Sequence, residues 1–358
     1  MFGSSKTAVG LDIGSHSIKV VEVERRDSRY RLKNYAIREI LPEGQSLESE
    51  GPSENDVIGA LNEAFREIKV KPKRVKKLGS SIGGQAVTVK QIRSISLAPE
   101  ELESSLTFEA RKYLPPDEAE AVLDFQVLKG DISTSHMDIL LVASSRKGFN
   151  QHMDLLEAVG CKPGIVDVDS LSIINSYLLL NSVPDEGILV MLNIGAKKTN
   201  LIVLNPNGLF FTRDISYGGN HFTDDVRVSK GLDAAMAERS KKEEGVFAPV
   251  SQEETDGISL GHAGLGLSRR TTQENLANEV TRSLRYYVKE SGHNEFWKIL
   301  LAGGSAKIPQ LDEFLEEKLR VPVEVFDPTV QLEMGRGVSL DKEPQLAQAI
   351  GLALRTLQ

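Results

Sequence analysis

The chain has 358 residues, of which 40% are hydrophobic. It contains 43 Lys and Arg and 51 Asp and Glu, which gives a formal net charge of -8. This acidic balance argues against a general nucleic-acid binder, because phosphate backbones bind basic surfaces. The length predicts about two globular domains. No apolar stretch approaches the roughly 18 residues of a membrane-spanning helix, so we expect the chain in the cytosol, unless a partner holds it at a membrane. The lone Cys161 excludes an internal disulfide and is expected to be structural.

The chain begins with two apolar strands, at residues 7–13 and 17–24, joined by a short polar turn. Gly14 allows the tight turn, and the amides and hydroxyls that follow it can cradle phosphate oxygens. Lys19 can add a positive charge, and Asp12 can face a hydrated cation. The candidate phosphate-binding residues of this turn are Gly14, Ser15, His16, Ser17 and Lys19. Taken alone, the motif is equally consistent with an ordinary hairpin that has a polar tip.

A third strand at residues 29–40 and an amphipathic helix at 54–68 complete the first stretch of the chain. Between this helix and the next strand lies a basic run, residues 69–77, which holds six Lys and Arg. We expect this run to be a solvated edge, and weak contact with anionic lipid is the less favoured alternative.

The pattern changes near Ser94, where the sequence predicts a compact α/β module. The expected elements are a helix from Pro99 that ends at Pro115–Pro116, strands at 121–128 and 137–143, and a helix at 147–159. We therefore predict that residues 94–163 form a small module inserted into the first domain.

A second hairpin with the plan of the first occurs at residues 189–204, after a helix that crosses to a second domain near residues 185–187. Asn193 stands in it where Asp12 stands in the first hairpin. Its candidate phosphate-binding residues are Gly195, Ala196, Lys197 and Thr199. Two such hairpins, one per half of the chain, could grip a phosphate tail from opposite sides of a cleft.

A third glycine turn follows the strand at residues 299–302 and precedes a helix expected to begin near Pro309. Paired glycines let a flat nucleoside approach the backbone closely. The candidate nucleoside-binding residues of this turn are Gly303, Gly304 and Ser305. Before it, we expect a mobile loop at residues 245–267 and a core helix at 275–290.

Together these segments resemble the actin-like ATPase superfamily over nearly the whole chain. The resemblance implies an α/β, actin-like two-domain nucleotide-binding fold with an FtsA-type α/β subdomain inserted in the first domain. It also implies ATP and Mg2+ as ligands, with Asp12 and Asn193 reaching the metal through water. Residues 237–241 resemble the Ala-Glu-x-x-Lys helix of bacterial actin homologues, which implies nucleoside contacts for Glu238 and Lys241. A solvated helix face is the competing interpretation of that helix.

The same resemblance implies bounds for the domains. These are 1–93, 164–187 and 336–358 for the first domain, 94–163 for the insert, and 188–335 for the second domain, with a smaller subdomain at about 221–291.

Within that superfamily, the resemblance is to the type IV pilus assembly protein PilM family. The segments that carry it are residues 10–19, 109–115, 167–170 and 348–355. It implies a cytoplasmic ATP-binding scaffold in the inner-membrane platform of type IV pili, which serve twitching motility, with the insert as an SHS2-type subdomain. The implied partner is the cytoplasmic tail of the membrane protein PilN, docked in a groove beside the insert, so membrane association would be indirect. The resemblance leaves pilus assembly ATPases and self-association open as further contacts.

One position departs from the superfamily pattern, which has Asp where this chain has Asn193. A carboxylate there helps to hold hydrated magnesium and can orient the attacking water, whereas an amide brings no charge and is not a base. We therefore expect nucleotide binding to persist, expect hydrolysis to be weak or absent, and assign no catalytic residue. Asp167 or Asp169 could supply a carboxylate near the cleft, although Asp in such a strand-to-helix turn is more often a helix cap.

Two alternative functions stay open. An FtsA-like cell-division filament protein usually carries a linker and an amphipathic membrane helix after the core, whereas this chain stops at Gln358 directly after its last core helix, which favours PilM. A small-molecule kinase of the same fold would need a carboxylate base that faces an acceptor hydroxyl, and nothing in the sequence identifies an acceptor pocket.

Overall fold

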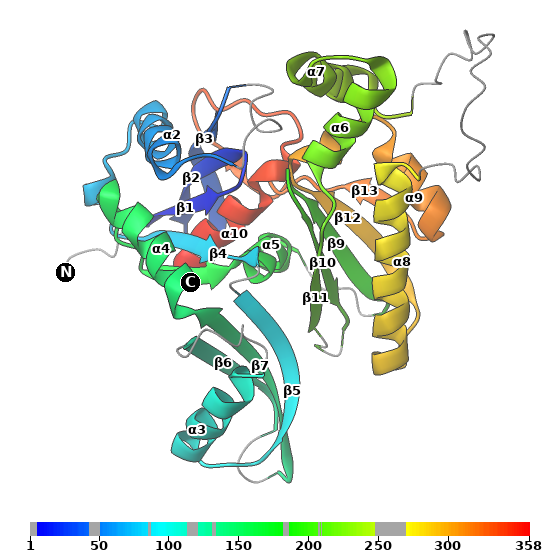
Figure 1. Cartoon of the computed structure of the whole chain (residues 1–358). Coiled ribbons are helices and arrows are strands. Elements are labelled where there is room, and N and C mark those ends of the chain that lie inside the picture. Colours follow the sequence, from blue (N-terminus) through cyan, green and yellow to red (C-terminus); the bar gives the residue numbers. More distant parts are fainter. Residues whose placement is uncertain are drawn as a thin grey trace.

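The computed structural model describes residues 6–42, 51–84, 87–112, 121–130, 134–181, 186–206, 208, 210–247 and 270–358. These residues form two lobes, each built around one β-sheet, and a smaller module that lies below the first lobe in Figure 1. The predicted α/β architecture is therefore confirmed.

The first lobe contains a six-stranded sheet in the order β14-β3-β2-β1-β4-β8. Its strands are β1 (Thr7–Ile13), β2 (Ser17–Arg26), β3 (Arg29–Glu39), β4 (Leu78–Ile82), β8 (Ile165–Val168) and β14 (Glu333–Met334). The helices of this lobe are α2 (Glu54–Glu67), α4 (Arg146–Ala158), α5 (Asp169–Leu178) and α10 (Ala347–Thr356). Successive side chains of a strand point to opposite faces, so Val9 and Leu11 pack against α2 and α4. Ala8 and Val21 pack against α10 on the other face.

The second lobe contains a five-stranded sheet in the order β11-β10-β9-β12-β13. Its strands are β9 (Ile188–Ile194), β10 (Thr199–Leu204), β11 (Phe210–Ile215), β12 (Phe296–Ala302) and β13 (Val323–Val325). The helices α8 (Thr272–Ser291) and α9 (Leu311–Leu319) pack against this sheet. Leu276, Val280 and Leu284 of α8 are buried in that core, as the four-residue spacing predicts.

A pair of helices, α6 (Gly219–Lys230) and α7 (Ala234–Glu244), stands above the second sheet in Figure 1. The expected subdomain at 221–291 is thus smaller than predicted, because α8 belongs to the core of the second lobe. The helix expected near Pro309 also differs. A short 3-10 turn, η3 (Gly304–Lys307), comes first, and α9 begins only at Leu311.

The inserted module is a three-stranded antiparallel sheet in the order β5-β7-β6, with one helix packed on it. Its elements are β5 (Val87–Ile95), α3 (Pro99–Ala110), β6 (Ala121–Lys129) and β7 (His136–Ser145). The first strand of the module thus begins at Val87, before the expected lower bound of 94–163. At the other end, α4 contacts β6 and β7 of the module and also packs on α2 through Leu156 in the core of the first lobe.

Cys161 lies in that same core, where burial raises the pKa of its thiol to about 12, which agrees with the predicted structural role. Across the described ranges, no helix has the length and apolar character needed to cross a membrane. Three expected features lie outside the described residues: Tyr113–Pro115 of the helix end, Pro116, and most of the loop at 245–267.

Candidate functional site

The three glycine turns meet around one cavity of about 870 Å3 between the two lobes. Residues from both phosphate-facing hairpins, from the third turn and from α7 line it. The predicted site residues on its wall are Asp12, Gly14, Ser15, His16, Ser17, Lys19, Asn193, Gly195, Ala196, Lys197, Glu238, Lys241, Gly303, Gly304 and Ser305. The structure therefore brings these predicted residues to one place, although they lie in four distant segments of the chain.

Thr199 is the exception among the predicted residues. Its side chain is fully buried and its hydroxyl donates to the carbonyl oxygen of Tyr217 at 2.7 Å. It does not line the cavity, and we withdraw it as a phosphate contact. The residue instead ties the second hairpin to the chain that leads into α6.

The first hairpin places a buried ion pair directly beneath its turn. The antiparallel register of β1 and β2 sets Asp12 opposite Lys19, and the Lys19 Nζ lies 3.2 Å from the Asp12 Oδ2. The Lys19 ammonium also donates to the carbonyl oxygen of Ser17 at 3.3 Å, and the Gly14 amide closes the turn onto the same oxygen at 3.2 Å. A fixed positive charge and a carboxylate thus face the cavity side by side.

The second hairpin places a neutral amide pair at the matching register. Asn193 lies opposite Asn200, and the Asn193 Nδ2 donates to the Asn200 Oδ1 at 3.2 Å. Asn200 in turn donates to the carboxylate of Asp214 on β11 at 2.5 Å. Because its amide nitrogen is used in this way, Asn193 has its carbonyl oxygen left to accept a hydrogen bond from metal-bound water.

The start of α6 supports the second turn from behind, and sequence reasoning missed its role. The amide of Gly219 donates to the carbonyl oxygen of Gly195 at 2.8 Å, and that of Asn220 donates to Ala196 at 2.8 Å. Gly218 allows this approach, since a Cβ there would lie 2.6 Å from the Gly195 oxygen. Gly219 and Asn220 also line the cavity. In the sequence, the run Gly218-Gly219-Asn220 after a strand could have indicated that this segment belongs to the site.

The third turn packs against the second hairpin. Gly303 has a φ of 85°, and a Cβ there would lie 2.5 Å from the carbonyl oxygen of Ile194. Only glycine suits this position. The reason is that the turn packs against the second hairpin here, and not the close approach of a nucleoside that was expected from the sequence. Gly304 is more open, since a Cβ there would meet nothing nearer than the Gln345 Oε1 at 3.4 Å. Ser305 donates weakly to the carbonyl oxygen of Gly195 at 3.5 Å.

The pair predicted on α7 is buried and already satisfied. The Lys241 Nζ lies 2.6 Å from the Glu238 Oε2 and also donates to the Thr223 hydroxyl at 2.9 Å. Burial raises the pKa of Glu238, but Lys241 and Thr223 outweigh that effect and hold the pKa below its usual value. Burial lowers the pKa of Lys241, and Glu238 opposes the shift. The pair is not the solvated helix face that sequence reasoning kept as the alternative.

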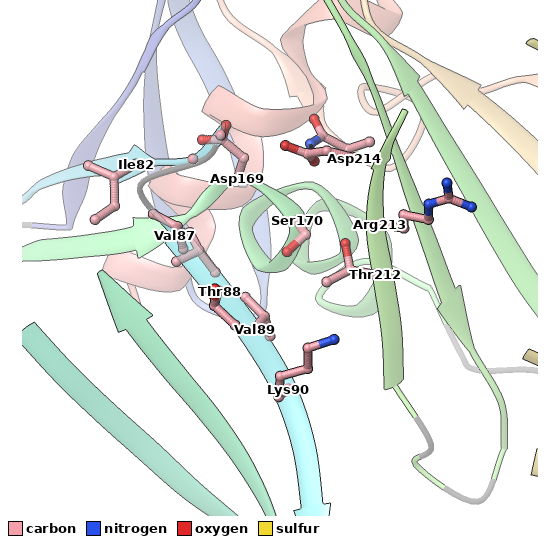
Figure 2. Close-up of a pocket in the computed structure, with 14 residues that line it drawn as sticks. Ile82, Val87, Thr88, Val89, Lys90, Asp169, Ser170, Thr212, Arg213 and Asp214 are labelled. Atoms are coloured by element: carbon pink, nitrogen blue, oxygen red, sulfur yellow. Dashed lines mark hydrogen bonds between the residues drawn. The ribbon is translucent and has the colours of Figure 1, made fainter. Parts of the chain in front are cut away.

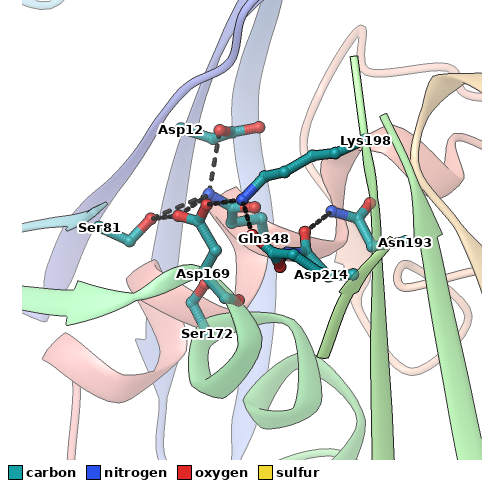
Figure 3. Close-up of polar contacts among 9 residues, drawn as sticks. Asp12, Ser81, Asp169, Ser172, Asn193, Lys198, Asp214 and Gln348 are labelled. Atoms are coloured by element: carbon teal, nitrogen blue, oxygen red, sulfur yellow. Dashed lines mark hydrogen bonds and ion pairs between the residues drawn. The ribbon is translucent and has the colours of Figure 1, made fainter. Parts of the chain in front are cut away.

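The floor of the cavity is a polar cluster centred on Asp169 (Figure 3). The amide nitrogen of Gln348 on α10 lies 3.0, 2.9 and 3.0 Å from oxygens of Asp12, Ser81 and Asp169, so its two N–H groups are shared among three acceptors. Lys198 approaches Asp169 from the second lobe, with 4.0 Å between the Nζ and the Oδ2. Burial raises the pKa of the Asp169 carboxyl to about 6, with Asp12 adding to the rise and Lys198 opposing it.

Of the two carboxylates that the sequence left open, the structure brings Asp169 to the cavity and leaves Asp167 away from it. Asp169 is the first residue of α5 and makes no cap hydrogen bond, since the N-cap position belongs to Val168. Asp167 is buried and pairs with Arg355 at 3.4 Å.

His152 is a further cavity residue that sequence reasoning missed. Burial lowers its pKa to about 4, so the ring is neutral at neutral pH, and it hydrogen-bonds the Ser80 hydroxyl at 3.0 Å.

A weak ion pair crosses the mouth of the cavity between the lobes. The Lys242 Nζ of α7 lies 3.8 Å from the Glu39 Oε1 at the end of β3. His16 of the first turn approaches the same carboxylate oxygen at 3.5 Å. A hydrogen bond from His16 is the main cause that lowers the pKa of Glu39, with burial opposing it and Lys242 assisting. No feature of the sequence marks Glu39 or Lys242 as neighbours.

The residues present fit a magnesium ion held together with phosphate. Mg2+ usually keeps several waters and takes one or two carboxylates plus substrate phosphate oxygens, rather than a complete protein cage. Asp12 supplies a carboxylate beside the first turn, and Asn193 supplies a neutral oxygen on the other lobe. The described part of the chain holds no group of three His, Cys, Asp or Glu that could bind a metal ion.

A second cavity of about 250 Å3 lies beside the inserted module. Figure 2 shows β5 on one side of it, β11 on the other, and Asp169 and Ser170 of α5 at its inner end. The Phe210 amide of β11 donates to the Gln91 Oε1 of β5 at 2.9 Å, which joins the module to the second lobe. The two cavities share part of their walls, including Gly83, Asp169 and Asn200.

Comparisons with known proteins agree with this architecture. A family model described as type IV pilus assembly protein PilM matches residues 10–255, and one described as cell division protein FtsA matches residues 190–351. Among solved structures, a chain of the PilM-PilN type IV pilus biogenesis complex is 23% identical and superposes with a TM-score of 0.79, covering 98% of each chain.

Two more distant structures share the fold at 12% identity and a TM-score of 0.52. The ethanolamine utilization protein EutJ from Carboxydothermus hydrogenoformans covers 97% of this chain and 89% of its own. A diol dehydratase-reactivating factor in nucleotide-free form covers 98% and 100%. The chain therefore has the actin-like two-domain fold that the sequence predicted, with a small α/β module inserted in its first lobe.

Proposed function

Because this chain belongs to the type IV pilus assembly protein PilM family, we propose that it is a cytoplasmic ATP-binding scaffold of the pilus assembly platform. The observation that carries the proposal is the convergence of three glycine turns from two lobes on one cavity. In this proposal ATP lies between the lobes and holds them closed. The chain is recruited to the inner membrane by its partner rather than by a span of its own.

The charges of the cavity support one orientation of the nucleotide. The phosphates lie between the two hairpin turns, where Lys19 and Lys197 supply positive charge and backbone amides can donate. The nucleoside lies toward Gly304 and Ser305, beneath Glu238 and Lys241. Asp12 and Asn193 would hold hydrated Mg2+ through its water ligands, and the ion when bound would neutralise phosphate charge.

The polar groups around the phosphates favour binding over hydrolysis. Asn193 is not a base, and its amide nitrogen is occupied by Asn200. Asp169 is a carboxylate on the floor of the cavity whose pKa of about 6 would let it accept a proton near neutral pH. We propose slow turnover at most, with Asp169 as its carboxylate base.

We further propose that the second cavity receives the cytoplasmic tail of a PilN-like membrane protein. The structural relative was solved as a PilM-PilN complex, and this cavity lies beside the inserted module. Since the two cavities share Gly83, Asp169 and Asn200, a tail seated in one would contact the wall of the other. Affinities for nucleotide and tail would then be coupled, and by the same factor in both directions.

The test is isothermal titration of the purified chain with ATP, with and without Mg2+, repeated with a synthetic PilN tail peptide. We expect one ATP per chain, tighter binding with Mg2+, and weaker binding in Lys19→Gln. The matched control is Lys33→Gln, which removes the same charge from β3 outside the cavity lining, where Lys33 pairs with Glu22 of β2. Absence of ATP binding under every condition would refute the nucleotide proposal, and equal ATP affinity with and without bound peptide would refute the coupling.

A further inference from the structure

The segment that joins α2 to β4, residues 69–77, carries the densest positive charge of the chain and has no part in either cavity. We call it the basic segment. Its cations are Lys69, Lys71, Lys73, Arg74, Lys76 and Lys77. No Asp or Glu occurs in the sequence between Glu67 and Glu100, so the segment is positive within a chain of net charge -8.

The basic segment is folded, and its fold points the cations outward. The amide of Val70 donates to the Phe65 carbonyl oxygen at 3.1 Å, and that of Val75 donates to Pro72 at 3.0 Å across a 3-10 turn. Val70 and Val75 pack against the core of the first lobe. Five of the six cationic side chains are exposed as a result, and Lys77 is half-buried.

These cations lack counter-ions within the described part of the protein. No described carboxylate lies within ion-pair distance of any of the six, and Glu67, the nearest in sequence, pairs with Arg38 at 2.6 Å. The stem of Lys73 lies against Gly160, so the exposed Lys162 extends the same positive surface. Glu157 is the exposed acid one turn before Gly160, and the surface stays strongly positive with it included.

We propose that the basic segment contacts the anionic headgroups of a lipid bilayer directly. Five of its six cations are lysines on flexible stems, spread along nine residues, which suits a plane of negative charge better than a single bound phosphate. A single-stranded nucleic acid fits less well, because the segment offers no aromatic side chain on which a base could stack. Figure 1 shows this connection at the edge of the first lobe remote from the second, so lipid contact leaves the cleft open.

The proposal goes beyond nucleotide and tail binding, and its test uses neither. The intact chain is floated with vesicles of phosphatidylcholine alone or with about one third phosphatidylglycerol, at low salt and at about 0.5 M salt. We expect recovery with anionic vesicles only, and loss at high salt. The variant Lys71→Gln/Lys73→Gln/Lys76→Gln should lower the partition coefficient about tenfold or more.

The matched control is Lys129→Gln/Lys289→Gln/Lys342→Gln, which removes the same charge from three exposed positions on other elements. It should bind vesicles nearly as the unmodified chain does. Equal losses in the two variants would overturn the proposal, because net charge and not the basic segment would then set binding. So would tight binding of a labelled oligonucleotide at the same salt without binding to vesicles, or no binding to anionic vesicles at all.

Discussion

The two phosphate-facing hairpins share a backbone plan and differ in the pair of side chains at its centre. In the first lobe the strand register sets Asp12 against Lys19 as an ion pair. In the second lobe the same register sets Asn193 against Asn200 as an amide pair. The comparison teaches that turn geometry and charge are separable: both hairpins can present amides to a phosphate, but only the first also presents a buried carboxylate with its own cation.

The largest effect should come from crowding the turn of the second hairpin. A Cβ in Gly218→Ala would meet backbone atoms of Gly195, Ala196 and Lys198 at 2.6 to 2.8 Å. We expect the free energy of unfolding, measured in urea, to fall by about 3 kcal/mol. Gly14→Ala in the first hairpin should cost less, since its contacts at 2.9 Å include the movable end of Lys19. Equal losses would show that the two turns are equally enclosed.

Next in size is the loss of the cation from the first hairpin. Lys19→Gln should weaken ATP binding about 30-fold, or about 2 kcal/mol, because a charge-assisted contact to phosphate is lost. Lys198→Gln should weaken it less, since the Lys198 Nζ is directed to two carboxylates, 2.7 Å from Asp214 and 4.0 Å from Asp169. Lys19, in contrast, has Asp12 alone among the described carboxylates. Titration calorimetry compares the two, and melting temperatures check that both variants are folded. A larger loss in Lys198→Gln would reverse the assignment of charge to the first lobe.

A third prediction concerns the carboxylate between the hairpins. The pKa of Asp169 is about 6 in the folded chain, above its ordinary value of 3.8, so the folded state holds this proton more tightly. The contribution of Asp169 to the free energy of unfolding is therefore fully present below about pH 4, and it is lost as the pH rises through 6. Asp169→Asn should raise the free energy of unfolding at pH 7.5 by roughly 1–2 kcal/mol and flatten its slope between pH 4 and 6. An unchanged slope in denaturant titrations would contradict this.

Restoring charge to the second hairpin gives a smaller and more specific effect. Asn193→Asp should make ATP binding more dependent on magnesium, because a second carboxylate would face the hydrated cation. We expect the ratio of the dissociation constants in EDTA and in Mg2+ to rise about tenfold, or about 1.4 kcal/mol. If the ratio does not change, the side chain at this position does not face the metal.

The smallest effect should come from the ion pair across the cavity mouth. Glu39→Gln removes an interlobe contact with Lys242 that is part-exposed, and such pairs contribute about 0.5 kcal/mol. The dissociation rate of a fluorescent ATP analogue should therefore rise about twofold. Lys242 also pairs with Glu238 at 3.3 Å, so Lys242→Gln alone is the reference for a double variant. Glu39→Gln/Lys242→Gln should then release the analogue no faster than Lys242→Gln does, and a further rise in the double variant would assign the effect of Glu39 to His16 instead.

Local sequence patterns predict many of the helices and strands of this fold. The apolar strands that flank Gly14 and Gly195, and the spacing of Leu276, Val280 and Leu284, predict elements close to those observed. The start of the inserted module could not be predicted from sequence. The pattern of β5 is that of any strand of the first domain, and only its pairing with β7 assigns it to the module.

The floor of the cavity could not be predicted. Gln348 stands 336 residues from Asp12, and nothing near either marks them as hydrogen-bonded. Asp169 looks like a helix cap in sequence, and only tertiary packing distinguishes it from Asp167. The prediction that Thr199 contacts phosphate is wrong for a related reason. A hydroxyl beside a glycine turn can face a ligand or a neighbouring carbonyl, and the sequence does not distinguish the two.

The position of α10 has a consequence for biosynthesis. This helix, residues 347–356, forms much of one face of the first lobe and brings Gln348 to three side chains that emerge from the ribosome much earlier. The N-terminal strands can pair during translation, but Asp12, Ser81 and Asp169 have no shared donor until α10 is made. A nascent chain should therefore be unable to retain ATP, and the cavity should become competent only once α10 has been released and docked.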